Sequence, residues 1–445
     1  MRGQNNNHNQ EQVFNQNLES TLNPKNPIYQ LSHRIPWQEF DMGFSKYYTQ
    51  RRGRPGKAVR LMTSLLILKQ MYDLSDEETV WQWVENPYWQ YFSGETEFQW
   101  EYPCDPSELT KFRNRIGQEG VEKIFEVSIK LHGKNATERE LIPDTTVQEK
   151  NITFPTDTKL NLKVIEWVWR VSEQEGIELR QSYKRTVPEL RWNARYLRVP
   201  TREKEGRKAV RRIKTVARRL LRDLERKMEA ELKCKYEEYI RNCHRIINQK
   251  RNDKDKIYSL HEPEVSCIAK GKEHKKYEFG SKVSILLTKG SNIIVGAVNF
   301  QGNPYDGKTL DASLEQYKRL MDMEPTRVLV DEGYRGKDKS GETEILHVHK
   351  KRKKGWSRWR WNQRFKRRAA VEPVIGHLKH DYRLGRNFLK GVIGDSINLM
   401  LSCAAFNFKK LLNELQFILS LIETVLKIVF GPKYFSKIEF DICFS

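Results

Sequence analysis

The chain is 445 residues long, which is enough for two or three domains with sizeable buried cores. Its 80 Lys and Arg against 58 Asp and Glu leave a formal charge of +22, more than solubility requires, so a polyanion is the expected partner. Nucleic acid fits best, with an anionic membrane surface or a basic packing protein as alternatives. Six scattered cysteines without a C-x-x-C pair indicate neither a zinc site nor a disulfide framework, and they point to a reducing compartment.

The N-terminal part combines a polar tail with a helical region. The first 26 residues are rich in Asn and Gln and lack an apolar stretch, which predicts a disordered tail over residues 1–30 and excludes a secretory signal. Residues 31–135 show helical patterns, with a helix over 57–72, a capping box at Ser75 and Glu78, and a helix start at Asp105. The short basic helix after Asp105 fits a helix-turn-helix DNA reader and a docking domain equally well. We therefore expect an all-α N-terminal domain for DNA binding or docking.

A long basic helix follows a short β-like segment at residues 141–151. From Val210 to Tyr236 apolar residues recur at steps of three and four, the pattern of an amphipathic helix. Between Arg202 and Lys227 the sequence has twelve Lys or Arg and four Asp or Glu, so the outer face is strongly positive. Such a run by itself is usually a solvated face, but the basic balance of the whole chain favours DNA contact. We assign residues 159–259 to a basic helical insertion.

The pattern changes to strands from residue 264 to residue 300, and a helix over 311–321 and a short buried strand over 328–330 follow. These elements predict an α/β domain with a mixed sheet, formed by residues 136–158 and 260–410 around the insertion. The apolar stretch 411–430 is interrupted by charged residues, which argues against a membrane span. We expect residues 411–445 to be an amphipathic helix for packing or oligomerisation, with a tail.

Three acidic residues stand out as candidates for chemistry. Asp144 follows a proline, where an aspartate is usually a turn or cap residue. Asp331 ends a Val/Leu strand, close to low-dielectric core, and needs a partner or a metal. Glu372 lies just after a strongly basic segment.

The surroundings of Glu372 strengthen its candidacy. Phe365, Arg368, Glu372 and Lys379 follow at steps of three, four and seven, which places them on one face if the segment is a continuous helix. Their side chains would then stack on a base, hold phosphates and hold a metal. Pro373 should kink or start that helix, and the alternative is an ordinary salt-bridged basic helix.

Phosphodiester cleavage requires an activated nucleophile, a stabilised pentacovalent state and a neutralised leaving oxygen. Two divalent ions held by carboxylates supply all three. Mg²⁺ is the expected ion, and Mn²⁺ is a plausible substitute.

These motifs together resemble those of a known family. PDTT around Asp144, VDEGYRG around Asp331 and F-x2-R-x3-E-x6-K around Glu372 resemble the DDE transposases of bacterial insertion sequences, specifically the insertion-sequence-five group. The last motif matches the Y-x2-R-x3-E-x6-K signature of the insertion-sequence-four-like superfamily, with Phe365 in place of the tyrosine. Residues 53–92 look like the leading helical domain of that family, so the resemblance covers most of residues 31–410.

The resemblance implies a ribonuclease H-like catalytic core in which Asp144, Asp331 and Glu372 bind metal and carry out catalysis. It implies cleavage at the ends of an insertion sequence and strand transfer into target DNA, in the cytoplasm of a bacterium and associated with the nucleoid. It also implies at least a dimer on DNA and no membrane. The alternatives are a structure-selective nuclease on the same core and a catalytically silent DNA-binding relic or regulator. The expected DNA contacts are Arg364, Phe365, Arg367, Arg368, Lys379 and Arg383.

Overall fold

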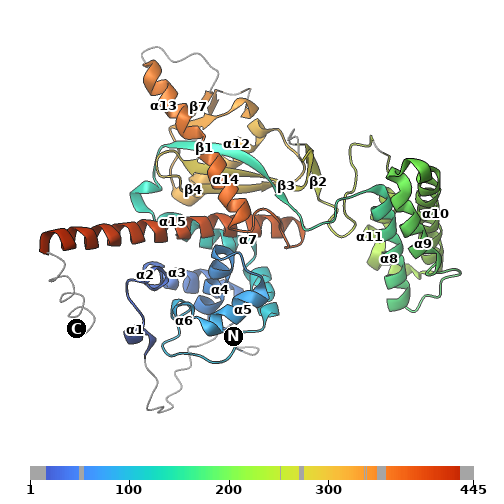
Figure 1. Cartoon of the computed structure of the whole chain (residues 1–445), viewed down its shortest axis with the longest axis horizontal. Coiled ribbons are helices and arrows are strands. Elements are labelled where there is room, and N and C mark those ends of the chain that lie inside the picture. Colours follow the sequence, from blue (N-terminus) through green and yellow to red (C-terminus); the bar gives the residue numbers. More distant parts are fainter. Residues whose placement is uncertain are drawn as a thin grey trace.

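A computed structural model describes residues 17–49, 55–250, 252–269, 275–334, 336, 338–347 and 357–430. Residues 1–16 of the expected tail and residues 431–445 lie outside this part of the chain. A group of N-terminal helices packs beneath a mixed sheet, and a helical insertion stands to one side (Figure 1). None of the helices in the described ranges combines the length and the apolarity that crossing a bilayer requires.

The N-terminal helices begin where local capping signals stand in the sequence. Ser75 and Asp105 each form a capping box with a glutamate three residues later, so α5 and α7 start as expected. The helix at Asp105 is longer than expected, because it continues past Gly117, where φ is +58° and the helix changes direction. The helices of this region are α1 (Leu18–Thr21), α2 (Pro27–Arg34), α3 (Trp37–Phe44), η1 (Ser45–Tyr47), α4 (Val59–Met71), α5 (Asp76–Glu85), α6 (Pro87–Phe92), α7 (Pro106–Lys130) and η2 (Gly133–Asn135).

One long helix joins the N-terminal helices to the sheet. This helix, α15 (Gly391–Phe430), packs against α4 and α7 on one side and β4 on the other. The side-chain amide of Asn407 bonds both the backbone N–H and the carbonyl of Ile294, at 3.0 Å and 2.9 Å, which completes the hydrogen bonding of β4. The C-terminal helix expected from Leu411 onward is therefore the second half of an element that begins twenty residues earlier.

The central sheet has seven strands in the order β2-β3-β1-β5-β7-β6, with β4 also paired to β3. Strands β1 and β3 are antiparallel, whereas β1, β5 and β7 run parallel to one another. This arrangement is the mixed sheet of the ribonuclease H-like fold, with the first strand in the centre. Helix α12 (Asp306–Met321) packs on β3 and β4, α13 (Arg358–Arg368) contacts β5, and α14 (Val371–His380) contacts β1. The strands are β1 (Glu140–Glu149), β2 (Ser266–Ala269), β3 (Tyr277–Thr288), β4 (Ile294–Phe300), β5 (Arg327–Val330), β6 (Lys339–Ser340) and β7 (Thr343–His347), with the short helix η5 (Glu332–Tyr334) after β5.

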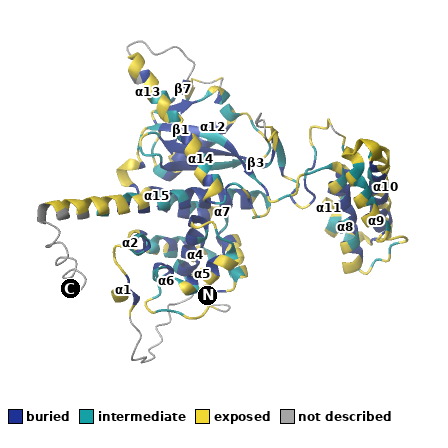
Figure 2. Ribbon diagram, in the orientation of Figure 1, coloured by how far each residue is buried: buried dark blue, intermediate teal, exposed yellow. Residues whose placement is uncertain are grey.

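The insertion between β1 and β2 has a hydrophobic core of its own. Its buried side chains, among them Val168, Leu220 and Ile246, form a cluster separate from the core shared by the sheet and the N-terminal helices (Figure 2). The helices of the insertion are α8 (Asp157–Gln174), α9 (Thr186–Asn193), η3 (Ala194–Arg198), η4 (Pro200–Arg202), α10 (Glu203–Lys227) and α11 (Ala230–Asn248).

Candidate active site

Two of the three candidate acids lie side by side at one edge of the sheet. The parallel ladder pairs Glu140 with Arg327 and Leu141 with Val328. Continuing that register by three residues puts Asp144 beside Asp331, which follows the last residue of β5. The pairing of β1 with β5 ends after Leu141, and this leaves space at the carboxyl end of β5. Parallel strands that separate at their carboxyl ends are where open α/β sheets place their sites.

A third carboxylate, that of Asp306, joins this pair. Burial raises the pKa of the Tyr334 hydroxyl well above its ordinary value, and the negative charges of Asp144, Asp306 and Asp331 raise it further. A Cβ on Gly333 would lie 2.6 Å from a carboxylate oxygen of Asp306 and 3.0 Å from one of Asp331. The three acids therefore lie near one buried tyrosine, and glycine at position 333 leaves room for Asp306 and Asp331.

Two cations neutralise part of this negative charge. The guanidinium of Arg368 lies 2.8 Å from Asp331, and the ammonium of Lys282 lies 2.5 Å from Asp306. The hydroxyl of Thr145 donates a hydrogen bond of 2.8 Å to Asp306. The second oxygen of Asp331 accepts a 2.8 Å bond from the backbone N–H of Gly333, so both of its oxygens are engaged.

Glu372 lies on a different element from the one the sequence pattern suggested. The segment is not one continuous helix, because α13 ends at Arg368 and α14 begins at Val371. Phe365 and Arg368 therefore lie on α13, whereas Glu372 and Lys379 lie on α14, and the single helical face that we expected does not form. Pro373 follows Glu372 in the first turn of α14, where a proline costs no helical hydrogen bond. Glu372 is exposed, on a helix that contacts β1.

The donor set suits a hard divalent ion, because carboxylate oxygens are the ligands that Mg²⁺ prefers. The chemistry of Asp144, Asp306 and Asp331 around Tyr334 therefore fits such an ion. Within the described ranges, however, no three His, Cys, Asp or Glu side chains are grouped closely enough to hold a metal. Asp331 has Arg368 as its partner instead, and Glu372 lies in the first turn of α14.

Of the DNA-contact candidates on α13, Arg368 contacts Asp331, and the others have partners elsewhere. Phe365 is half-buried and packs edge-on against Trp361, with 4.9 Å between ring centroids, so its ring is part of the packing. Arg364 pairs with Glu140 at 3.0 Å. Arg367 is exposed and donates a 2.5 Å hydrogen bond to the carbonyl of Gly290. Arg364 and Arg367, with Lys289 of the β3–β4 turn, line a basic pocket that contains Glu138 and Glu140.

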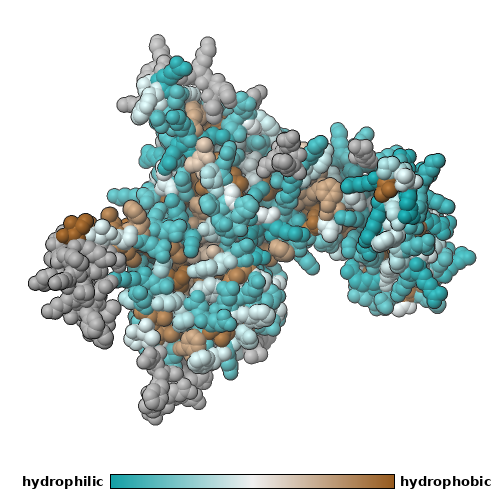
Figure 3. Space-filling view, in the orientation of Figure 1, coloured by the Kyte–Doolittle hydropathy of each residue, from teal (hydrophilic) through white to brown (hydrophobic). Residues whose placement is uncertain are grey.

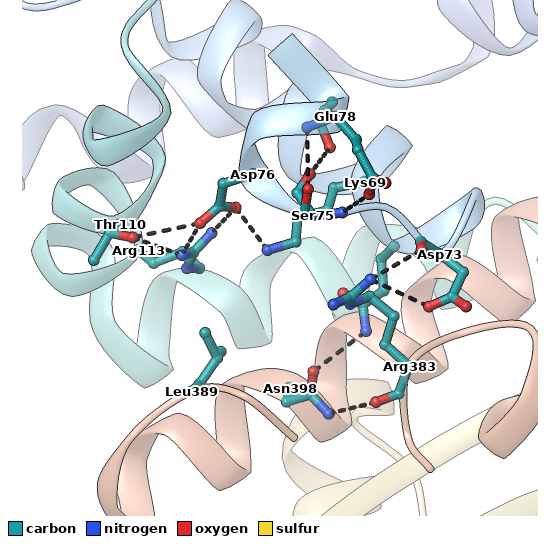
Figure 4. A network of polar contacts seen from close by, with 12 residues as sticks. Lys69, Asp73, Ser75, Asp76, Glu78, Thr110, Arg113, Arg383, Leu389 and Asn398 are labelled. Atoms are coloured by element: carbon teal, nitrogen blue, oxygen red, sulfur yellow. Dashed lines mark hydrogen bonds and ion pairs between the residues drawn. The ribbon is translucent and has the colours of Figure 1, made fainter. Parts of the chain in front are cut away.

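The remaining two candidates lie near other carboxylates. The Lys379 ammonium is 3.9 Å from Glu278 on β3. Arg383 donates a 2.9 Å bond to the carbonyl of Asp73 and lies 3.3 Å from its carboxylate, as Figure 4 shows. Arg383 thus ties the end of α14 to the N-terminal helices, a structural contact that the sequence did not reveal.

Asp306 is the residue of this site that sequence analysis missed. It opens α12, five residues before the start that periodicity indicated, and its neighbour Tyr305 supplies no capping side chain. A single acid at a helix start is common and carries no specific signal. Only the packing of α12 against β3 and β4 brings it to Asp331.

Comparison with known proteins agrees with this geometry. A family described as a transposase domain matches residues 16–115, and one described as a transposase DDE domain matches residues 247–408. The chain is 43% identical over 188 residues to a protein of Rhizobium meliloti described as uncharacterized protein ORF8 in the nfe locus; the match covers 41% of this chain and 90% of that protein. No solved structure matches the chain. With both matched domains present in order and two acids of the DDE motif adjacent at the sheet edge, the chain belongs to the DDE transposases.

Proposed function

We propose that this transposase cuts DNA at the ends of an insertion sequence and joins the freed 3′ ends to target DNA, in the manner of the insertion-sequence-five group. Asp144, Asp331 and Glu372 would hold Mg²⁺, with Mn²⁺ as a substitute. When bound, the ion would supply a Lewis acid that neutralises the phosphate and activates the attacking water or hydroxyl.

The observation that carries the proposal is the shared register of β1 and β5. It brings Asp144 and Asp331 to one sheet edge although 186 residues separate them in the sequence. A structural role alone does not require several carboxylates near one buried tyrosine, since like charges close together repel one another and cost stability. Arg364, Arg367 and Arg368 lie on the adjacent helix, where planar guanidinium groups suit phosphate oxygens.

Cleavage and joining of a labelled duplex with the native element end, in Mg²⁺ or Mn²⁺, would test the proposal. We expect Asp144→Asn, Asp331→Asn and Glu372→Gln each to lower the cleavage rate by more than about a hundredfold. Loss of a residue that only supports a metal ligand costs up to about a hundredfold, and loss of a ligand itself should cost more. Duplex binding without metal should remain. Glu315→Gln, an exposed acid on α12, is the matched control and should cut normally.

The same cleavage assay should include the variant Asp306→Asn. A loss as large as that of Asp331→Asn, with Glu372→Gln fully active, would make Asp306 the third ligand in place of Glu372. A wild-type protein that binds the duplex and never cuts it would contradict the proposal. The chain would then be a catalytically silent DNA-binding relic or regulator derived from a transposase.

We also propose that two copies associate through the free end of α15. Beyond the packed region this helix exposes Ile418, Leu421, Val425 and Ile428, at steps of three, four and three. That spacing is the seam of a two-stranded coiled coil, and a second copy of the same helix is its simplest partner. Figure 3 shows apolar side chains on this part of the helix. Joining two element ends in one reaction would also require two subunits.

A further inference from the structure

The helical insertion lies in a part of the chain that neither matched transposase domain covers. The matches end at residue 115 and resume at residue 247, whereas the helices α8 to α11 span residues 157–248. The longest helix of the insertion, α10, carries eleven Lys or Arg and four Asp or Glu between Glu203 and Lys227. No role for this helix follows from the active site.

Helix α10 has a buried apolar face and an exposed basic face. Its apolar residues, including Ile213, Leu220 and Leu224, are buried in the core of the insertion. At 100° per residue the opposite side presents one stripe within about 80° of arc. We call this the α10 stripe; it consists of Lys204, Lys208, Arg211, Arg218 and Arg222, all exposed.

The α10 stripe is not neutralised by the protein. The four acids of α10 lie beside the stripe and have other partners. Glu203 pairs with Arg207, Glu205 with Arg202, Asp223 with Arg226, and Glu225 with His244. Within the described part of the chain, no ion pair joins a residue of the stripe to a carboxylate. Five like charges on one helix repel one another, so the stripe is unfavourable until an anion of matching extent covers it.

A neighbouring segment packs against the side of α10 opposite the stripe. Helix η3 meets the start of α10 at Gly206, where a Cβ would lie 2.4 Å from the backbone nitrogen of Leu197. Only glycine allows this approach, and the stripe stays uncovered. Arg195 and Arg198 of η3 are exposed as well. Figure 3 shows the face of the insertion turned to the viewer as largely hydrophilic.

The two connections of the insertion meet in a buried ion-pair cluster. Lys150, where the chain leaves β1, lies 3.1 Å from Glu262, where the chain returns, and 2.9 Å from Asp395 of α15. All three side chains are buried. Both connections of the insertion are therefore anchored at the start of α15.

We propose that the α10 stripe is an auxiliary site for duplex DNA, which contacts the phosphate backbone without reading sequence. From Lys204 to Arg222 the stripe extends about 27 Å, or roughly eight base pairs of duplex. Exposed guanidinium and ammonium groups along that length match a regular row of phosphates. A membrane surface fits poorly, because a helix that binds lipid needs a free apolar face and that of α10 is buried. The choice of DNA as the polyanion rests on the proposed function.

The test measures binding of the full-length protein to a fluorescent duplex in EDTA, over a series of salt concentrations, so that no cleavage is needed. The variant Lys208→Gln/Arg211→Gln/Arg218→Gln removes three charges of the stripe. The matched control, Lys159→Gln/Lys163→Gln/Arg170→Gln, removes three exposed charges from α8, where Lys163 already pairs with Glu166 at 2.7 Å. Thermal unfolding of each variant shows that the fold is kept, as expected for exposed side chains.

We expect the stripe variant to lose affinity at least tenfold at low salt, equally for an element-end duplex and for a scrambled one. The slope of log affinity against log salt should become shallower by about 3, one for each phosphate contact removed. Equal affinities and slopes for wild type and stripe variant would overturn the proposal. So would stripe-dependent binding to phosphatidylserine vesicles with unchanged DNA binding. Because cleavage is not measured, loss of catalysis in the active-site variants does not affect this result.

Discussion

At the scale of single residues, the ion pair between Arg368 and Asp331 links the candidate metal site to DNA contact. A guanidinium that also holds a phosphate neutralises Asp331 less strongly. Its Nε is buried without a hydrogen-bond partner, so the present pairing leaves part of its donor capacity unused. DNA that draws Arg368 away would leave Asp331 free to bind an ion.

Removal of this cation should therefore strengthen metal binding without DNA. A partly exposed pair is worth about 1 kcal/mol, so Arg368→Gln should raise the affinity for Mn²⁺ about fivefold. Electron paramagnetic resonance of free Mn²⁺ measures this directly. Arg364→Gln, which breaks a pair with Glu140 at 3.0 Å, is the control and should leave Mn²⁺ affinity unchanged. Weaker Mn²⁺ binding by Arg368→Gln would show that the arginine supports the site.

Asp76 provides a prediction on stability. Burial alone would raise the pKa of its carboxyl, but the hydrogen bond from Arg113 and the charge of Lys69 lower the pKa to about 2 (Figure 4). Since the pKa in the unfolded chain is 3.8, the charged form stabilises the fold above about pH 4, and this stabilisation is lost as the pH falls towards 2.

Asp76→Asn should thus lower the free energy of unfolding by about 2 kcal/mol at pH 7. The difference in free energy of unfolding between variant and wild type should shrink below pH 3. Urea unfolding at pH 7 and below pH 3 measures both effects. Glu77→Gln removes a neighbouring charge from the same helix start but leaves the cluster intact, and should change stability little. A difference independent of pH would contradict the assigned role of Asp76.

At the scale of elements, the sequence predicted what local signals determine. The capping box at Ser75, the helix start at Asp105, the strand at 141–151 and the strands between residues 264 and 300 were predicted. Their caps, alternation and turn residues lie within a few positions of one another. The β1–β5 register and the place of Asp306 were not predictable, since both depend on pairing across the insertion. The break between α13 and α14 was missed because helical spacing alone does not reveal a two-residue turn at 369–370.

The free end of α15 gives a prediction on assembly. Ile418→Asp and Leu421→Asp each place a charge in the apolar seam, where burying it would cost several kcal/mol. We expect the wild type to be a dimer and both variants to be monomers, by light scattering after gel filtration. Ser420→Asp lies on the other side of the helix and should remain dimeric. A wild type that is monomeric at every concentration, with and without element ends, would rule out this contact.

At the scale of the whole molecule, α15 joins the N-terminal helices to the sheet, because it packs against both. Gln70 of α4 donates a 2.8 Å bond to Ser402 and a 2.9 Å bond to the carbonyl of Tyr382, both fully buried. His132, just after α7, bonds the carbonyl of Asn407 at 3.0 Å. The two regions matched by transposase domains thus meet on the same helix, and the connections of the insertion reach the start of that helix.

This placement has a consequence for how the protein is made. The helices α4 and α7 leave the ribosome long before the helix that covers their apolar side, because the insertion and the sheet strands are synthesised in between. Until residue 415 has emerged, the N-terminal region exposes the apolar surface that α15 later covers. Strand β4 also lacks its hydrogen bonds to Asn407 of α15 until then. A message cut short before this helix would therefore yield a chain prone to aggregation, and the complete fold would form only after translation has passed all three candidate acids.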